Sequence, residues 1–212
     1  MIAIIDYGMG NLHSVHNALK KVGFESVITS EREKVYKAKG VILPGVGAFP
    51  DCMENLKKLG LLEVIKDIVF KKPFLGICLG LQLLFEQSEE FGPVDGMKIF
   101  QGKVKRFPIG LEYNGEKLKI PHMGWNVAKI KGKTPFLKNI PEETYFYFVH
   151  SYYVETQDDI VATDTFYGIN FVSSIYWQDT LFACQFHPEK SQKYGLKILE
   201  NFGNIAYGRN LT

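Results

Sequence analysis

The chain has 212 residues, of which 46% are hydrophobic and 23% are charged, and its net charge is +2. This composition is close to that of an average globular protein and excludes a disordered chain, while the small net charge gives no electrostatic reason to expect nucleic acid. No apolar run approaches the roughly 20 residues that a membrane-spanning helix needs. We therefore expect a single domain over residues 1–212.

The cysteines and the first residues indicate the cellular setting. Cys52, Cys78 and Cys184 form an odd set with no paired spacing, which argues against a disulfide framework and against a zinc site. The start, "MIAIIDYGMGN", has no basic leader, so we interpret it as a strand rather than a signal peptide. We expect a cytoplasmic protein that uses no metal and no cofactor.

The first part of the chain alternates short apolar segments with amphipathic ones. Such alternation predicts right-handed crossovers and a parallel sheet that helices cover on both faces. Strands are expected at 2–6, 24–29, 40–45 and 73–77, and helices at 12–22 (ended by Gly23), 50–60 and 61–72.

The second part is richer in aromatic and β-branched residues. Antiparallel strands that extend the sheet are expected within 145–155, 160–177 and 181–189, with turns at Tyr167-Gly168 and Gln178-Asp179. A closing helix is expected over 191–208, with Ser191 as its N-cap. The predicted fold class is α/β: a flavodoxin-like domain with a mostly parallel central sheet, helices on both faces and an antiparallel extension in the second half.

A cysteine stands where the fourth expected strand meets helix-favouring residues, in "KKPFLGICLGLQLLFE". A sharp strand-to-helix turn pushes a side chain out of the sheet and needs small neighbours, which Gly76 and Gly80 supply. The N-terminus of the following helix offers N–H groups and a positive dipole end, which favour a thiolate. Cys78 is therefore a candidate nucleophile. The alternative is a small buried hydrophobic residue, as most free cysteines are.

Among the five histidines, only His187 stands at a strand end beside a carboxylate at close spacing, in "FACQFHPEKS". Pro188 restricts the backbone so that Glu189 can return to the imidazole and hold its tautomer, as the acid of a catalytic triad does. Sites of α/β proteins gather at the carboxyl ends of strands, which favours this interpretation over a simple surface turn. His187 is the candidate base and Glu189 its orienting group.

The segment "LPGVGAF" also follows an expected strand directly. Two glycines two residues apart allow the backbone to turn an N–H group toward a small ligand, as an oxyanion hole requires. Alone, such a loop is more often only a turn. Three motifs at the carboxyl ends of three strands together predict a catalytic cysteine site.

These motifs resemble those of a known family. "GICLGLQ" with "HPEKS" resembles the class I (triad) glutamine amidotransferases, and "DYGMGNL", "LPGVGAF", "PHMGWN" and "YFVHSYY" are most similar to the glutaminase subunits of imidazole glycerol phosphate synthase. The resemblance covers essentially the whole chain, with the motifs in the same order. It implies the class I amidotransferase fold and an enzyme that hydrolyses glutamine to glutamate and ammonia.

The resemblance also implies roles for individual residues. Cys78 would be the nucleophile, His187 the general base and Glu189 the orienting carboxylate. Val46, Gly47 and Leu79 would form the oxyanion hole, in which the strand Pro44-Gly45-Val46-Gly47 turns over before Val46 offers its N–H, and Gln82, Ser151 and Tyr152 would contact the substrate glutamine.

A partner is implied as well. Ammonia must not reach bulk water, where protonation removes its nucleophilicity, so a second protein has to cap the site and receive it. In the family this protein is a (β/α)8-barrel cyclase subunit, which forms a heterodimer with the glutaminase and uses the ammonia in histidine biosynthesis. Family positions at or near that interface match Asn11, Trp125, Tyr147 and Lys190, which otherwise read as a loop asparagine, two sheet aromatics and a surface lysine.

Three other functions are open at this level. A paralogous pair of subunits could deliver ammonia to a surface-sugar precursor, and "FPIGLEYNGEKLK" (107–119), longer than expected, weakens the histidine-pathway prediction slightly. A stand-alone cysteine hydrolase of the γ-glutamyl type would leave "PHMGWN" without a role. A non-catalytic flavodoxin-like binding module would keep Cys78 buried and inert.

Overall fold

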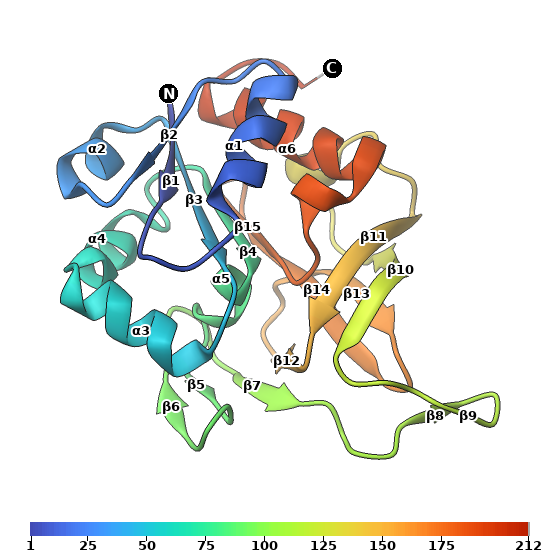
Figure 1. Cartoon of the computed structure of the whole chain (residues 1–212). Helices are drawn as coiled ribbons and strands as arrows, with labels where there is room; N and C mark the ends of the chain where they lie inside the picture. Colours follow the sequence, from blue (N-terminus) through green and yellow to red (C-terminus); the bar gives the residue numbers. More distant parts are fainter. Residues whose placement is uncertain (212) are drawn as a thin grey trace.

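In the computed structural model, which describes residues 1–211, the first part of the chain alternates strands and helices (Figure 1). Its elements are β1 (Ile2–Ile5), α1 (Leu12–Lys21), β2 (Ser26–Thr29), α2 (Arg32–Lys37), β3 (Gly40–Gly45), α3 (Phe49–Lys58), α4 (Leu61–Ile68), β4 (Phe74–Cys78) and α5 (Leu79–Gln82).

Strands dominate the rest of the chain. The longest helix, α6, has 15 residues, and no helix within residues 1–211 has the length and apolar character needed to cross a membrane. The elements are β5 (Gln87–Ser88), β6 (Val94–Asp95), β7 (Lys103–Arg106), β8 (Glu112–Tyr113), β9 (Glu116–Lys117), β10 (His122–Ile130), η1 (Pro135–Leu137), β11 (Glu143–His150), β12 (Tyr152–Glu155), β13 (Val161–Phe166), β14 (Asn170–Trp177), β15 (Leu181–Cys184), η2 (Pro188–Lys190) and α6 (Gln192–Ala206).

The strands join into a mixed sheet in the order β2-β1-β3-β4-β15-β14-β12-β7-β5-β6, with β10, β11 and β13 attached beside β14. β1 pairs in parallel with β2 and β3, β3 with β4, and β4 with β15. β14 pairs antiparallel with β15, β13 and β12, and β10 with β11. The expected parallel core and antiparallel extension are both present.

The central strands are buried on both faces, which explains why their sequences are continuous apolar runs rather than alternating ones. Successive residues of β3 point to opposite sides: Leu43 joins one hydrophobic cluster with Leu56 of α3 and Ile65 of α4, and Ile42 joins the other with Leu19 of α1. Figure 1 shows α3 and α4 on one side of the sheet and α1 and α6 on the other.

Several elements differ from the sequence prediction, among them β15, α2 and β10. β15 was expected to be antiparallel, but it pairs in parallel with β4 as well as antiparallel with β14, so it belongs to the parallel core. The short helix α2 and the strand β10 were not predicted. β10 gave no signal because buried and exposed residues do not alternate regularly along it.

Ser191 stands at the N-cap position of α6, as predicted, but its side chain does not cap the helix. Its Oγ donates to the His187 carbonyl oxygen at 2.6 Å and accepts the Tyr147 N–H at 2.9 Å. The hydroxyl therefore joins β11 to the segment that carries His187.

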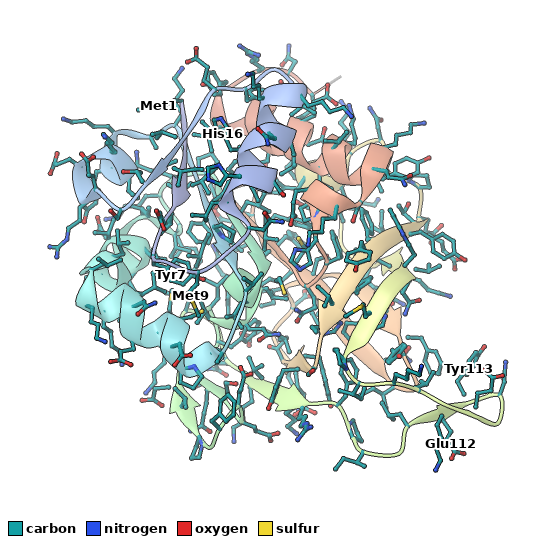
Figure 2. The ribbon with its side chains drawn as sticks, viewed as in Figure 1. Met1, Tyr7, Met9, His16, Glu112 and Tyr113 are labelled. Carbon is teal, nitrogen blue, oxygen red and sulfur yellow. The ribbon has the colours of Figure 1, made fainter. Side chains whose placement is uncertain are left out.

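The long segment 107–119 contains a two-stranded hairpin, β8 with β9, that projects from the molecule (Figures 1 and 2). Its turn residues Asn114 and Gly115 have φ values of 52° and 80°, as the tightest hairpin turns require. The Asn-Gly pair was a hairpin signal that the sequence analysis missed. The Tyr113 ring packs edge-on against Phe166, with ring centroids 5.3 Å apart.

Candidate active site

A pocket of about 330 Å³ opens at the carboxyl ends of β3, β4 and β15. The three motifs found in the sequence meet there: Val46 and Gly47 follow β3, Cys78 ends β4, and His187 follows β15. We call it the catalytic pocket, after the role that the sequence predicts for these residues. The other residues that line it are Leu79, Gln82, Glu90, Val149, His150, Ser151 and Tyr152.

Cys78 occupies a strained backbone turn, with φ 54° and ψ −108°. Residues other than glycine rarely adopt a positive φ, and at a strand end this turn projects the side chain from the sheet. A Cβ on Gly76 would lie 2.7 Å from the Gly80 carbonyl oxygen, so the flanking glycine is required by close approach. The helix dipole that the sequence predicted contributes little to stabilising negative charge here, because α5 has only four residues. The free N–H groups of its first turn are the donors available to a developing charge.

The other two cysteines are not among the residues that line the catalytic pocket. All three are free thiols. Burial raises the pKa of Cys52 to about 11 and raises the pKa of Cys184 well above its usual range. Both are therefore protonated at neutral pH, and Cys78 is the one thiol of the three that faces the pocket.

His187 and Glu189 form a buried pair. Nδ1 of His187 lies 2.8 Å from Oε1 of Glu189, and their side chains are 2% and 1% exposed. Burial acts to lower the pKa of His187, but the negative charges of Cys78 and Glu189 outweigh it and raise that pKa well above its usual value. Nδ1–H must point to the carboxylate, which leaves Nε2, buried and without a hydrogen bond in residues 1–211, for the pocket.

Gln185 is a site residue that the sequence analysis missed. Its Nε2 donates to Sγ of Cys78 at 3.6 Å, and its Oε1 accepts from Nε2 of Gln82 at 2.9 Å. An N–H aimed at the sulfur favours the thiolate. The two-residue spacing from His187 was the available signal, because alternate residues of an extended segment point to the same side.

The segment after β3 packs against the loop that follows β1, where Figure 2 labels Tyr7 and Met9. The Tyr7 hydroxyl donates to the Pro44 carbonyl oxygen at 2.9 Å. A Cβ on Gly45 would lie 2.6 Å from that hydroxyl oxygen, and Gly47 has φ +100°. The two glycines are therefore required by a close contact and by the backbone conformation, respectively.

The far wall of the pocket is backbone from residues 149–152. The Ser151 carbonyl oxygen accepts the Phe107 N–H at 3.1 Å. The Tyr152 carbonyl oxygen accepts from Nε2 of Gln82 at 3.0 Å and from Nδ1 of His150 at 2.8 Å. Ser151 and Tyr152 line the pocket, as the sequence predicted, and both of their carbonyl oxygens already accept from protein donors.

Glu90 was not predicted either, although its carboxylate lines the pocket. Oε2 accepts the Phe49 N–H at 2.8 Å, and burial raises the pKa of this carboxyl group. Among the residues that line the pocket, Glu90 carries the one carboxylate.

The residues predicted to face a partner are partly gathered on one surface. Trp125 and Tyr147 are paired in the β10–β11 ladder, with ring centroids 6.1 Å apart, and Lys190 Nζ lies 5.9 Å from the centre of the Tyr147 ring. The Trp125 side chain is 46% exposed. Asn11 lies at the N-cap position of α1 and makes no side-chain cap bond.

Comparison with known proteins places this geometry in a family. The family model described as "Glutamine amidotransferase class-I" matches residues 3–205. The chain belongs to the class-I glutamine amidotransferases. It is 50% identical over 206 residues to "Imidazole glycerol phosphate synthase subunit HisH" of Geobacter sulfurreducens, covering 96% of this chain and 98% of the relative. The protein of the same name from Caldanaerobacter subterraneus is 53% identical over 207 residues, covering 97% and 98%.

Solved structures of amidotransferases share the fold. "Structure of PurLQS from Thermotoga maritima" aligns with a TM-score of 0.73 at 18% identity, over 96% of this chain and 97% of that chain. The glutaminase domain of Trypanosoma brucei CTPS, solved with bound acivicin, aligns with a TM-score of 0.71 at 16% identity, over 100% and 95%. This amidotransferase therefore has the α/β fold that the sequence predicted.

Proposed function

We propose that this chain is the glutaminase subunit of an imidazole glycerol phosphate synthase. It hydrolyses glutamine to glutamate in the catalytic pocket and passes ammonia to a (β/α)8-barrel cyclase subunit in histidine biosynthesis. The observation that carries the chemistry is Cys78 on its strained turn, in one pocket with His187 and its carboxylate partner. The relatives at about half identity, matched over nearly their whole length, support the assignment to this synthase.

The reaction begins when the Cys78 thiolate attacks the side-chain amide carbon of glutamine. The tetrahedral intermediate then collapses, its carbon–nitrogen bond breaks, and His187 gives a proton to the departing ammonia. Water attacks the resulting thioester, His187 takes one of its protons, and the thiolate leaves as glutamate forms. Glu189 keeps the proton on Nδ1, so that Nε2 is the atom that exchanges protons.

The oxyanion of both tetrahedral intermediates needs two N–H donors. Leu79 follows the nucleophile directly, and its backbone N–H is one donor. The second comes from Val46 or Gly47, on the segment held by Tyr7. Gln185 assists the thiolate from its other side.

Substrate recognition follows from the polar groups of the pocket. Both hydrogens of the Gln82 amide are used, by the Tyr152 carbonyl and by Gln185, which leaves Oε1 of Gln82 to accept from glutamine. The Glu90 carboxylate suits the α-ammonium group. The remaining backbone of Ser151 and Tyr152 closes the wall.

The partner surface is proposed to include Asn11, Trp125, Tyr147 and Lys190. The exposed Trp125 ring beside Tyr147 is the kind of aromatic pair that anchors protein interfaces. Lys190 follows the catalytic Glu189 in the chain, so a contact there is one residue from the triad.

The test is a glutaminase assay with the cyclase subunit, together with complementation of a histidine auxotroph that lacks its own glutaminase subunit. We expect glutamate release that needs Cys78, and growth without histidine. Glutamate release without rescue, when the matching cyclase is supplied, would assign the ammonia to another acceptor, such as a surface-sugar precursor. No glutamate release under any condition would refute the enzyme.

A further inference from the structure

Two buried histidines next to the catalytic pocket have no role in the proposed mechanism. His122 in β10 and His150 at the end of β11 face each other, with Nδ1 of His122 2.9 Å from Nε2 of His150. His122 is 2% exposed and His150 is 6% exposed. Buried polar side chains of this kind are kept where their hydrogen bonds are satisfied, and here each ring nitrogen has a partner.

The backbone dictates which nitrogen of each ring carries the proton. Nδ1 of His150 lies 2.8 Å from the Tyr152 carbonyl oxygen, which can only accept, so His150 is protonated at Nδ1. Nε2 of His150 is then an acceptor, and His122 must donate to it from Nδ1. This leaves Nε2 of His122 as an acceptor.

Asn126 extends this series of hydrogen bonds beyond His122, at the end farther from the catalytic pocket. Its Oδ1 accepts the Val127 N–H at 2.8 Å, and its Nδ2 donates to the Phe166 carbonyl oxygen at 2.9 Å, so the amide can lie in only one orientation. Nδ2 also lies 3.2 Å from Nε2 of His122 and donates to it. Every hydrogen bond from Asn126 to the Tyr152 carbonyl therefore points in the same direction.

The surroundings keep both rings uncharged. His122 is stacked between Phe148 and Tyr167, with ring centroids 4.9 and 4.0 Å away, and Phe107 lies 5.2 Å from His150. Burial lowers the pKa of His122 to about 4 and, with smaller effects from neighbouring histidines, that of His150 to about 3. A second proton on either ring would also place two N–H donors opposite each other in this series of hydrogen bonds.

The inner end of this series of hydrogen bonds reaches Cys78 and the glutamine wall, which is the pocket wall formed by residues 149–152. The Tyr152 carbonyl that accepts from His150 also accepts from Gln82, which bonds to Gln185, which donates to Cys78. The outer end lies in β10 next to the exposed Trp125, where His122 and Asn126 line a second pocket of about 360 Å³. The chain thus connects the proposed partner-facing strand with the substrate site.

We propose that His122 and His150 are positioning residues: as a neutral, one-directional hydrogen-bond relay they hold the Tyr152 carbonyl, and through it Gln82, in the geometry that binds glutamine. The inference rests on the proposed glutaminase function. Neither histidine touches the reacting atoms, so their loss should weaken substrate binding more than it slows chemistry.

The first test compares two substitutions that separate packing from hydrogen bonding. His122→Phe keeps a ring for the aromatic stack but removes the donor to His150. His122→Asn loses the ring but keeps an N–H donor near the position of Nδ1. In the complex with the cyclase, we expect His122→Phe to raise KM for glutamine about tenfold while kcat changes less than threefold, since an unsatisfied buried acceptor costs on the order of one factor of ten.

The order of the variants is the diagnostic result. His122→Asn should be the less stable protein, yet its KM should be closer to that of the wild type. If the histidine served packing alone, the ranking by KM would follow the ranking by stability instead. The matched control is His16→Phe, in helix α1 away from the pocket (Figure 2). It removes a side-chain hydrogen bond of similar length, 2.8 Å from Nδ1 of His16 to Oγ of Ser26. This variant should leave KM unchanged.

Two electrophiles distinguish a failure of the relay from a failure of the proposed function. A glutamine-analogue electrophile needs the glutamine wall, whereas iodoacetamide needs only the thiolate. We expect His122→Phe to slow labelling of Cys78 by the analogue about tenfold and labelling by iodoacetamide less than twofold. Equal analogue labelling of wild type and variant would overturn the relay, while wild type that the analogue never labels would overturn the glutaminase itself.

A measurement on the wild type needs no variant. Nitrogen-15 NMR of the imidazole rings at pH 7 should find both histidines neutral and protonated at Nδ1. A charged ring, or a proton on Nε2 of either histidine, would contradict the relay even if every substitution failed to fold.

Discussion

Gly80 packs so closely against the carbonyl oxygen of Leu43 that a Cβ added to it would overlap that oxygen. The contact joins the turn after Cys78 to β3, so it fixes the proposed nucleophile relative to the proposed oxyanion segment, Pro44–Gly47. Because the obstacle is backbone, no side-chain rotation relieves it.

Gly80→Ala should therefore lower the free energy of unfolding by about 3 kcal/mol or more, the upper range for overpacking. Urea denaturation measures this. Gly110→Ala is the matched control: a Cβ there meets nothing within 4 Å, and only its φ of +81° is unfavourable, which costs about 1–2 kcal/mol. Equal losses in the two variants would show that the contact with β3 is unimportant.

The pH profile should report the raised pKa of His187. The imidazolium is present at neutral pH, and it is lost only as the pH rises through that raised value. Glu189→Gln removes one of the charges that raise it, so the alkaline limb of kcat/KM should move to lower pH. We also expect kcat to fall by about 10- to 100-fold, because the imidazolium loses its buried counter-charge.

The measurement is steady-state glutamate release between pH 6 and 11 for wild type and Glu189→Gln. His187→Ala sets the scale, with an expected loss of about 10²–10⁴-fold or more. An alkaline limb at the same pH in wild type and Glu189→Gln would mean that another group controls it.

Replacing the nucleophile should remove turnover and spare the fold. Cys78→Ala deletes a single sulfur, so we expect no measurable glutaminase activity and a thermal midpoint close to that of the wild type. Synthesis by the assembled complex from added ammonium salt should persist, because it bypasses the thiol. Cys184→Ala is the control: it removes an inert buried thiol and should cost some stability but little activity. Glutamine hydrolysis by Cys78→Ala would refute the assignment of Cys78 as the nucleophile.

The elements that sequence reasoning found are those with a local signal. The strands β3 and β4 are apolar runs bounded by glycine or proline, and Cys78 is conspicuous because Gly76 and Gly80 flank it. A strained turn needs small neighbours wherever it occurs, so this pattern is visible in a few adjacent letters.

What it missed depends on contacts between distant parts of the chain. Gln185 reaches Cys78 across 107 residues, and His122 meets His150 across 28. The spacing of Gln185 from His187 shows only that both side chains lie on one side of the segment, and no local pattern identifies Cys78 as the partner of Gln185 or His150 as the partner of His122, because packing of whole strands brings them together. The direction of β15 could not be predicted for the same reason, since a short apolar strand has the same sequence pattern beside a parallel or an antiparallel neighbour.

The last prediction is that the isolated chain is nearly idle and that its partner activates it. Glycines in Pro44–Gly47 allow the oxyanion segment to hold an N–H toward the substrate or away from it, and Tyr7 holds only the Pro44 carbonyl before it. One oxyanion-hole donor is worth about 10²–10³ in rate. A partner that favours the aimed conformation should therefore raise turnover by up to that factor through a population shift.

Glutamate release by the free chain, by the complex, and by the complex with acceptor ligand measures this activation. Lys190→Ala should reduce the stimulation, because Lys190 lies over Tyr147 on the proposed partner surface and follows Glu189 in the chain. Lys193→Ala is the control, since it removes another lysine that lies over a ring, 5.2 Å from Tyr194, in helix α6. Equal rates in all three states would refute the switch but leave the triad intact, whereas equal stimulation of the two lysine variants would place the transmitting contact elsewhere on the partner surface.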